Sequence, residues 1–179
     1  MQLSLDQDLQ SAMRRTHLDG APGVAASGAV WLVSAVVCFG LGVPKAVWAL
    51  LIGGALISPL SNVLKKLLGA PSEAKSNNAL NHLALATTIW LIACCFMAFG
   101  LYLHDETWFF PAMMLTIGSR YLVFSILFGL TIYWVLGGLL IGAGALAFYL
   151  SSPALYSALV GATVEIAFAV ILFSRLSRH

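Results

Sequence analysis

Six long runs of apolar residues make up most of the chain and restrict how it can fold. They cover residues 22–42, 44–64, 82–103, 108–128, 130–150 and 153–174. About 20 apolar residues in a helix cross the ~30 Å hydrocarbon core of a bilayer. Inside that core every backbone polar group needs an internal hydrogen bond, which a helix supplies. The sequence therefore predicts an all-α polytopic membrane protein with six transmembrane helices.

The connections between these runs are short, which predicts three antiparallel hairpins. A longer polar segment, GAPSEAKSNN, separates the first hairpin from the second. Only 9% of the 179 residues are charged, far below the quarter that is usual in soluble domains, so we expect no separate soluble domain. We predict a cytoplasmic N-terminal segment (1–21), a transmembrane domain (22–174) and a cytoplasmic tail (175–179).

The distribution of basic residues predicts the orientation in the membrane. With six spans both termini lie on one side, and seven of the nine lysines and arginines fall there: Arg14, Arg15, Lys65, Lys66, Lys75, Arg175 and Arg178. Cytoplasmic loops carry an excess of such residues. We therefore predict a multi-pass protein of the inner (cytoplasmic) membrane with both termini in the cytoplasm.

The first 20 residues allow two interpretations. Leu5, Leu9 and Met13 recur at helical spacing, which is typical of a short amphipathic helix on the membrane surface. An unstructured tail is the alternative. Asp6, Asp8 and the absence of an apolar core in this segment argue against a cleavable signal peptide.

One arginine and one glutamate lie deep within the predicted spans. Counted from the outer ends, Ser58, Arg120 and Glu165 all come about 12 or 13 residues in, roughly 18 to 20 Å deep. A charge there costs ~2.5 to 3.5 kcal/mol on insertion scales, and a guanidinium cannot lose its proton. Because Glu165 is the only carboxylate in any run, we predict that Arg120 and Glu165 pair, either as a ligand site or as a purely structural ion pair.

Other polar residues reach the same half of the bilayer. Asn62, Thr87 and Tyr121 join Ser58, Arg120 and Glu165 as candidate ligand-binding residues. Pro59 removes a backbone hydrogen bond, so we expect a helix kink there. Together these residues predict a polar cavity that opens toward the cytoplasm. For the serine and threonine, hydrogen bonding to their own helix is the alternative, and Asn62 would then face the interface.

Pairs of small residues four positions apart predict where helices approach one another. GLLIG at 138–142 is a GxxxG pattern, and Gly54 with Ser58 and Ser157 with Gly161 are similar pairs. We expect these surfaces to pack within the bundle, although they also fit a homo-oligomer.

Several functions are not supported by the sequence. The cysteines Cys38, Cys94 and Cys95 all lie in apolar runs and fit small buried hydrophobic residues. His82 and His104 lie at opposite membrane faces and cannot share a metal or haem. No catalytic or phosphate-binding motif is present, and basic residues form no stripe for nucleic acid. We therefore predict no metal, no cofactor, no catalytic residues and no nucleic-acid partner.

Three stretches carry a resemblance to a known family: GSRYLVF at 118–124, GGALISPLSNVLKKLL at 53–68 and NNALNHL at 77–83. The chain resembles a family of small bacterial six-span integral membrane proteins of unknown function, with GxRYxxF and PLS stretches. The resemblance implies six spans and draws attention to Arg120, Tyr121, Pro59 and Ser58, but supplies no activity. The chain has Val123 where that family pattern has proline.

Three functions follow, in order of preference. The first is a small transporter or solute- and proton-binding protein of the lipid bilayer, in which Arg120 and Glu165 hold a small charged solute or a proton. The second is a non-catalytic membrane sensor or assembly subunit whose ion pair sets helix register. The third is a membrane-embedded lipid-modifying enzyme with Glu165 as acid or base, placed last because paired carboxylates and metal ligands are missing.

Overall fold

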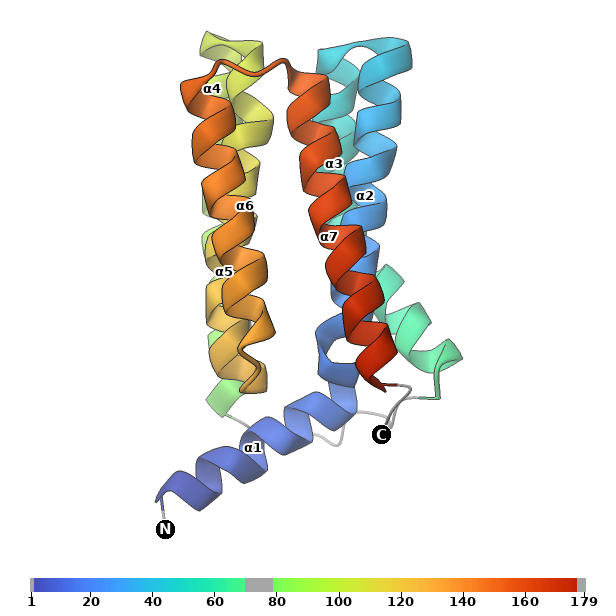
Figure 1. Ribbon diagram of the computed structural model, residues 1–179, viewed down its shortest axis with the longest axis vertical. Helices are drawn as coiled ribbons and strands as arrows, with labels where there is room; N and C mark the ends of the chain where they lie inside the picture. The colour runs from blue at the N-terminus through green and yellow to red at the C-terminus, as the bar shows by residue number, and fades with distance from the viewer. Residues whose placement is uncertain (1, 70–78, 177–179) are drawn as a thin grey trace.

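A computed structural model describes residues 2–69 and 79–176 and shows a bundle of long helices (Figure 1). Six helices are long and apolar enough to cross a membrane, which confirms the predicted fold class. Lys75 and residues 177–179 of the predicted tail lie outside the described residues. In chain order the elements are α1 (Gln2–His17), η1 (Leu18–Gly20), α2 (Ala21–Leu41), α3 (Val43–Leu67), α4 (Ala79–His104), η2 (Glu106–Trp108), α5 (Phe109–Phe128), α6 (Ile132–Tyr149) and α7 (Ala154–Leu176).

The six long helices form two groups of three (Figure 1). In the first helix group α2 packs against α3 and α7, and in the second helix group α5 packs against α6 and α4. α7 connects the groups through its contacts with α5 and α6. Successive helices run antiparallel, as three hairpins require, but α6 and α7 contact each other less than they contact α5 and α2.

Local sequence signals set several helix ends. Gly42 after α2 and Gly129 after α5 have φ values of 89° and 62°, which residues with a side chain rarely adopt. Pro22 and Pro44 lie in the first turns of α2 and α3, where the missing N–H is not needed. These signals explain why the helix limits agree closely with the apolar runs.

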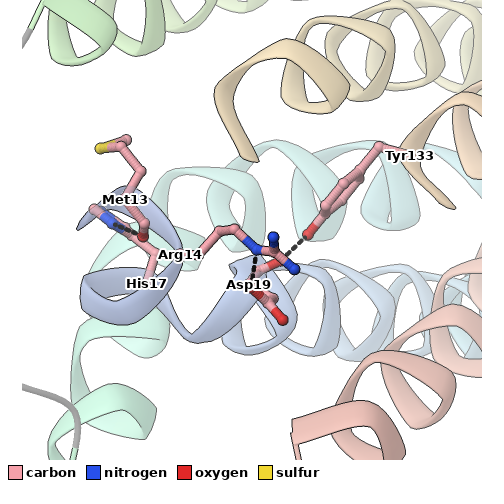
Figure 2. Close-up of polar contacts among 5 residues, drawn as sticks. All are labelled: Met13, Arg14, His17, Asp19 and Tyr133. Carbon is pink, nitrogen blue, oxygen red and sulfur yellow. Dashed lines mark hydrogen bonds and ion pairs between the residues drawn. The ribbon is translucent and has the colours of Figure 1, made fainter. Parts of the chain in front are cut away.

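The N-terminal segment is a helix that lies across one end of the bundle, which we call the α1 end (Figure 1). The chain turns into α2 at Leu18–Gly20, where all three residues have positive φ. The Tyr133 hydroxyl donates to the carbonyl oxygen of Asp19 at 2.6 Å, and Arg14 Nε lies 3.0 Å from Asp19 Oδ1 (Figure 2). Gln10 Nε2 also donates to the Ile126 carbonyl oxygen at the end of α5. Of the two alternatives for this segment, the structure shows the helix.

The two helix groups pack by different means. In the first, the fully buried Trp31 indole fits against Gly161, where an added Cβ would lie 2.8 Å from the ring. In the second, α5 and α6 touch backbone to backbone: a Cβ on Gly137 would lie 2.6 Å from the carbonyl oxygen of Gly118. A Cβ on Gly144 would lie 2.9 Å from the carbonyl oxygen of Pro111.

Only one of the three predicted small-residue pairs packs against another helix. Ser157 and Gly161 are buried against α2, as predicted. The prediction for the GxxxG pair was wrong. Among the described residues Gly138 and Gly142 face open space, while the nearby Gly137 and Gly144 make the contact with α5. Gly54 also faces open space within the described residues.

Only the last turns of α3 diverge from the bundle (Figure 1), because a Cβ on Gly23 of α2 would still lie 3.9 Å from Ser61 Oγ. The buried residues of this helix, Ala46, Val47 and Leu50, all lie in its first third. Pro59 lies inside α3 before these turns, where the loss of a backbone hydrogen bond favours bending. Ser58 and Asn62, beyond Leu50, are exposed.

Candidate functional site

The most deeply buried charged residue is Glu165, at the midpoint of α7. Its side chain is 0% exposed, and neither carboxyl oxygen has a hydrogen-bond partner among the described residues. The hydroxyl groups of Ser27 and Tyr121 and the indole N–H of Trp31 are donors close enough to act on the carboxyl group, although none makes a full hydrogen bond with it. Glu165 therefore lies in a small polar region enclosed by α2, α5 and α7.

Regular helical spacing builds this region. Ser157, Gly161 and Glu165 follow one another at intervals of four residues, so they share one face of α7. Ser27 and Trp31 share a face of α2 in the same way. α2 and α7 approach closely at Gly28, which has no side chain. A Cβ there would lie only 3.3 Å from Cβ of Glu165.

Two further groups along this contact lack partners. Trp31 Nε1 and Ser157 Oγ are buried without a hydrogen bond among the described residues. Native proteins rarely leave such groups unsatisfied, so their clustering beside Glu165 requires an explanation. From the sequence, Ser157 was singled out only as a packing residue, and Ser27 and Trp31 were not singled out. A signal existed, because tryptophan prefers the membrane interface, whereas Trp31 lies near the middle of its span.

Arg120 lies on a different side of α5 from this region, against α4. Its Nη2 donates to Thr88 Oγ1 at 3.1 Å, and its guanidinium lies 5.2 Å from the centre of the Phe124 ring. Nε is buried and has no hydrogen-bond partner among the described residues. The side chain lines a cavity of about 370 Å³ between α4 and α5.

The predicted ion pair between Arg120 and Glu165 is not formed. The only ion pair between residues in the described ranges joins Arg14 to Asp19. Arg120 and Tyr121 are successive residues of α5, and one residue corresponds to a rotation of about 100° around a helix axis. Tyr121 therefore faces Glu165, while Arg120 faces α4. The number of residues from each helix end predicted the depth of the two charges in the bilayer. It could not predict the side of the helix on which each charge lies.

The structure separates the six predicted site residues into three places. Tyr121 is buried beside Glu165. Thr87 is buried beside Arg120 in the α4–α5 cavity and donates to the Ala84 carbonyl oxygen at 2.8 Å. Ser58 and Asn62 are exposed on the second half of α3.

The predicted common cavity at the cytoplasmic side is therefore not formed from these residues. The physical reason is the packing of α3, which places Ser61 beside Gly23 of α2 and leaves Ser58 and Asn62 exposed. No cluster of three or more His, Cys, Asp or Glu residues able to hold a metal occurs in residues 2–69 and 79–176.

Comparison with known proteins identifies the family of the chain but no function. Residues 7–175 match a family described as a family of unknown function (DUF7010). The chain belongs to the DUF7010 family. No curated protein and no solved structure matches this DUF7010 protein. The match covers nearly the whole chain and agrees with the resemblance to a family of unknown function.

Proposed function

We propose that this DUF7010 protein is a small transporter or solute- and proton-binding protein of a bacterial inner membrane, with Glu165 as the exchanging group. The observation that carries the proposal is the complete burial of Glu165 with both carboxyl oxygens unpartnered. Polar and ionisable groups within a membrane are costly and commonly mark ion or solute pathways.

Among the described residues, the Glu165 carboxyl group lacks the hydrogen bonds and the ion pair that would offset its burial. A buried polar group without a hydrogen bond costs on the order of 1 to 3 kcal/mol, and an isolated charge costs far more. The described residues place no cation against the carboxyl group, since Arg120 faces α4. A proton or a small cationic solute would remove the cost, and the hydroxyls of Ser27 and Tyr121 would stabilise the carboxylate left behind.

The position of Glu165 fits an exchange site. It lies at the midpoint of α7, the helix that connects the two helix groups, and its neighbours come from both groups. Transporters commonly bind their ligands near the bilayer midplane between helix groups that move against each other. A small relative movement of the groups would then open the Glu165 region to one side of the membrane.

The charge distribution supports a cytoplasmic location for the α1 end. Arg14, Arg15, Lys65, Lys66 and Arg175 all lie near that end, in α1 or in the last turns of α3 and α7. Lys45 lies at the opposite end. We therefore place both termini in the cytoplasm.

The first test measures the protonation of Glu165 directly. Full-length protein in bilayers is examined by infrared difference spectroscopy across a change of pH. We expect a band from a buried protonated carboxyl group, lost in Glu165→Gln. Glu106→Gln, which makes the same chemical change at an exposed residue, serves as the control and should keep the band.

The second test measures transport in proteoliposomes. A pH gradient is imposed, and uptake of labelled small amines, amino acids and carboxylic acids is followed. We expect uptake of at least one solute class, abolished in Glu165→Gln and retained in Glu106→Gln. Absence of any Glu165-dependent band together with absence of Glu165-dependent uptake would reject the proposal.

One observation favours the alternative, a non-catalytic sensor or assembly subunit. Only 11% of the most apolar stretch of α3 is buried, and Gly54 on this helix faces open space within the described residues. Small residues exposed on a transmembrane helix favour association with another helix. Co-purification of a stable partner that is lost in Gly54→Leu, with both Glu165 tests negative, would favour this function.

A further inference from the structure

The cavity between α4 and α5 is a groove on the side of the bundle. Its walls are formed by Ala86, Thr87 and Trp90 of α4 and by Ser119, Arg120 and Val123 of α5. Ala86 is exposed and Trp90 is 60% exposed, so the groove opens sideways, where a bilayer has its acyl chains. Arg120 is the only charged residue that lines it.

The Arg120 side chain extends toward the α1 end. Arg120 is eleven residues below Phe109, the first residue of α5, whereas Thr88 is sixteen residues below His104, the last residue of α4. At 1.5 Å per residue these positions lie about 16 and about 24 Å below the opposite end of the bundle. Because Nη2 donates to Thr88, the guanidinium lies well below its own Cα.

This direction brings the guanidinium close to the membrane surface at the α1 end. It lies 5.2 Å from the Phe124 ring, and Phe124 is only four residues, about 6 Å, from Phe128 at the end of α5. Arginine side chains near helix ends extend in this way toward the interface. The guanidinium is therefore within reach of the phosphate layer of one leaflet.

The hydrogen-bonding capacity of Arg120 is not filled. A guanidinium has five N–H donors, and one of its nitrogens donates to Thr88, while Nε is buried with no partner among the described residues. No carboxylate in the described ranges pairs with it. A phosphate group has the geometry to accept two parallel hydrogen bonds from such a group.

We propose that the α4–α5 groove binds an anionic phospholipid of the leaflet at the α1 end, with its phosphate on Arg120 and an acyl chain along Ala86, Trp90 and Val123. A lipid matches both features of the groove, a single cation and apolar walls that open sideways. A soluble anion would satisfy Arg120 but leave the apolar walls uncovered. The proposal goes beyond the Glu165 function and does not depend on it.

The test compares the association of spin-labelled phosphatidylglycerol and phosphatidylcholine with the full chain in bilayers. We expect the unaltered protein to prefer phosphatidylglycerol about tenfold, a typical gain for charge-assisted hydrogen bonds. Arg120→Gln should lose this preference. Arg175→Gln, which removes a charge in the last turn of α7, is the control and should retain most of it.

A second variant keeps the test decisive if Arg120→Gln does not fold. Val123→Trp fills the groove but leaves the guanidinium in place, and it should also abolish the preference. Equal preference in the unaltered protein and in a folded groove variant would overturn the proposal. Displacement of the labelled lipid by inorganic phosphate alone would also overturn it, because the site would then recognise a soluble anion.

Discussion

The two helix groups each carry one charged residue within the bilayer, but they surround it differently. In the first group Glu165 is completely buried and its oxygens have no partner in the described ranges. In the second group Arg120 is half-buried, donates to Thr88 and packs over Phe124. A carboxyl group can become neutral by taking up a proton, whereas a guanidinium cannot lose its charge. Only the first kind of group tolerates complete enclosure without a counter-ion.

The two helix groups also differ in the residues that make their helix contacts and in the polar groups buried there. The α5–α6 contact is made partly by glycines whose backbones touch and partly by aromatic rings, with Tyr121 stacked on Tyr133. The α2–α7 contact is made around Trp31, and buried polar groups lie along it. The Glu165 region of the proposed function therefore lies mainly in the first group, and the second group contributes Tyr121 to it.

The largest expected effect comes from removing Trp31. Trp31→Ala should lower the free energy of unfolding by ~3 to 5 kcal/mol, because a fully buried aromatic side chain is replaced by a cavity. Thermal unfolding in detergent micelles measures the change. Trp134→Ala is the control, since Trp134 is 56% exposed. Equal losses in the two variants would show that Trp31 does not organise the first group.

The glycine contact of the second group is tested by Gly137→Ala. An added methyl group would meet the carbonyl oxygen of Gly118 at 2.6 Å, so we expect a loss of ~1 to 3 kcal/mol from overpacking. Gly138→Ala provides a matched control one residue away, where the new methyl group enters open space. Thermal unfolding of both variants measures the loss. If Gly137→Ala were as stable as Gly138→Ala, close backbone contact between α5 and α6 would be contradicted.

Replacing the two charged residues by methionine should change the unfolding free energy in opposite directions. Glu165→Met should leave the unfolding free energy unchanged or raise it by up to ~3 kcal/mol, because it removes unsatisfied buried oxygens. Arg120→Met should instead lower stability slightly, since it removes the bond to Thr88 and the contact with Phe124. If Glu165→Met proved strongly destabilising, the carboxyl group would have partners that the described contacts do not include.

The turn between α1 and α2 should show a smaller effect. Tyr133→Phe removes the hydrogen bond to the Asp19 carbonyl oxygen and should cost ~0.5 to 1.5 kcal/mol. Hydrogen exchange should also become faster in α1, because the bond ties the turn to α6. Tyr149→Phe, at a residue that is 84% exposed, should change neither measurement.

The smallest expected effect lies in the α4–α5 turn. The Thr107 backbone N–H and its hydroxyl both donate to Asp105 Oδ1 at 2.8 Å, and these hydrogen bonds hold the pKa of Asp105 below its usual value. A lowered pKa contributes stability above the usual carboxyl pKa of ~3.9 and loses it as the pH falls through the lower folded value. Asp105→Asn should therefore lower Tm slightly at neutral pH, and the difference should disappear in acid.

Much of the candidate site could be predicted from particular residues. Arg120 and Glu165 stood out because charges are rare in apolar runs, and the structure places both within the spans. Tyr121 and Thr87 were also selected, and each lies beside one of these charges. Ser58 and Asn62 were selected by their depth, and Ser58 also by the family resemblance, but both are exposed on α3, away from the two charges.

The sequence by itself determined the six spans, their ends and the depth of each charge, because span length and hydrophobicity are properties of a single segment. Only the tertiary structure decided that Arg120 and Glu165 face different helices, and that Gly137 makes the helix contact and Gly138 does not. Lipid-facing and protein-facing surfaces of membrane helices are both apolar, so hydrophobicity does not reveal which way a residue points. That direction depends on packing partners that are distant in the chain.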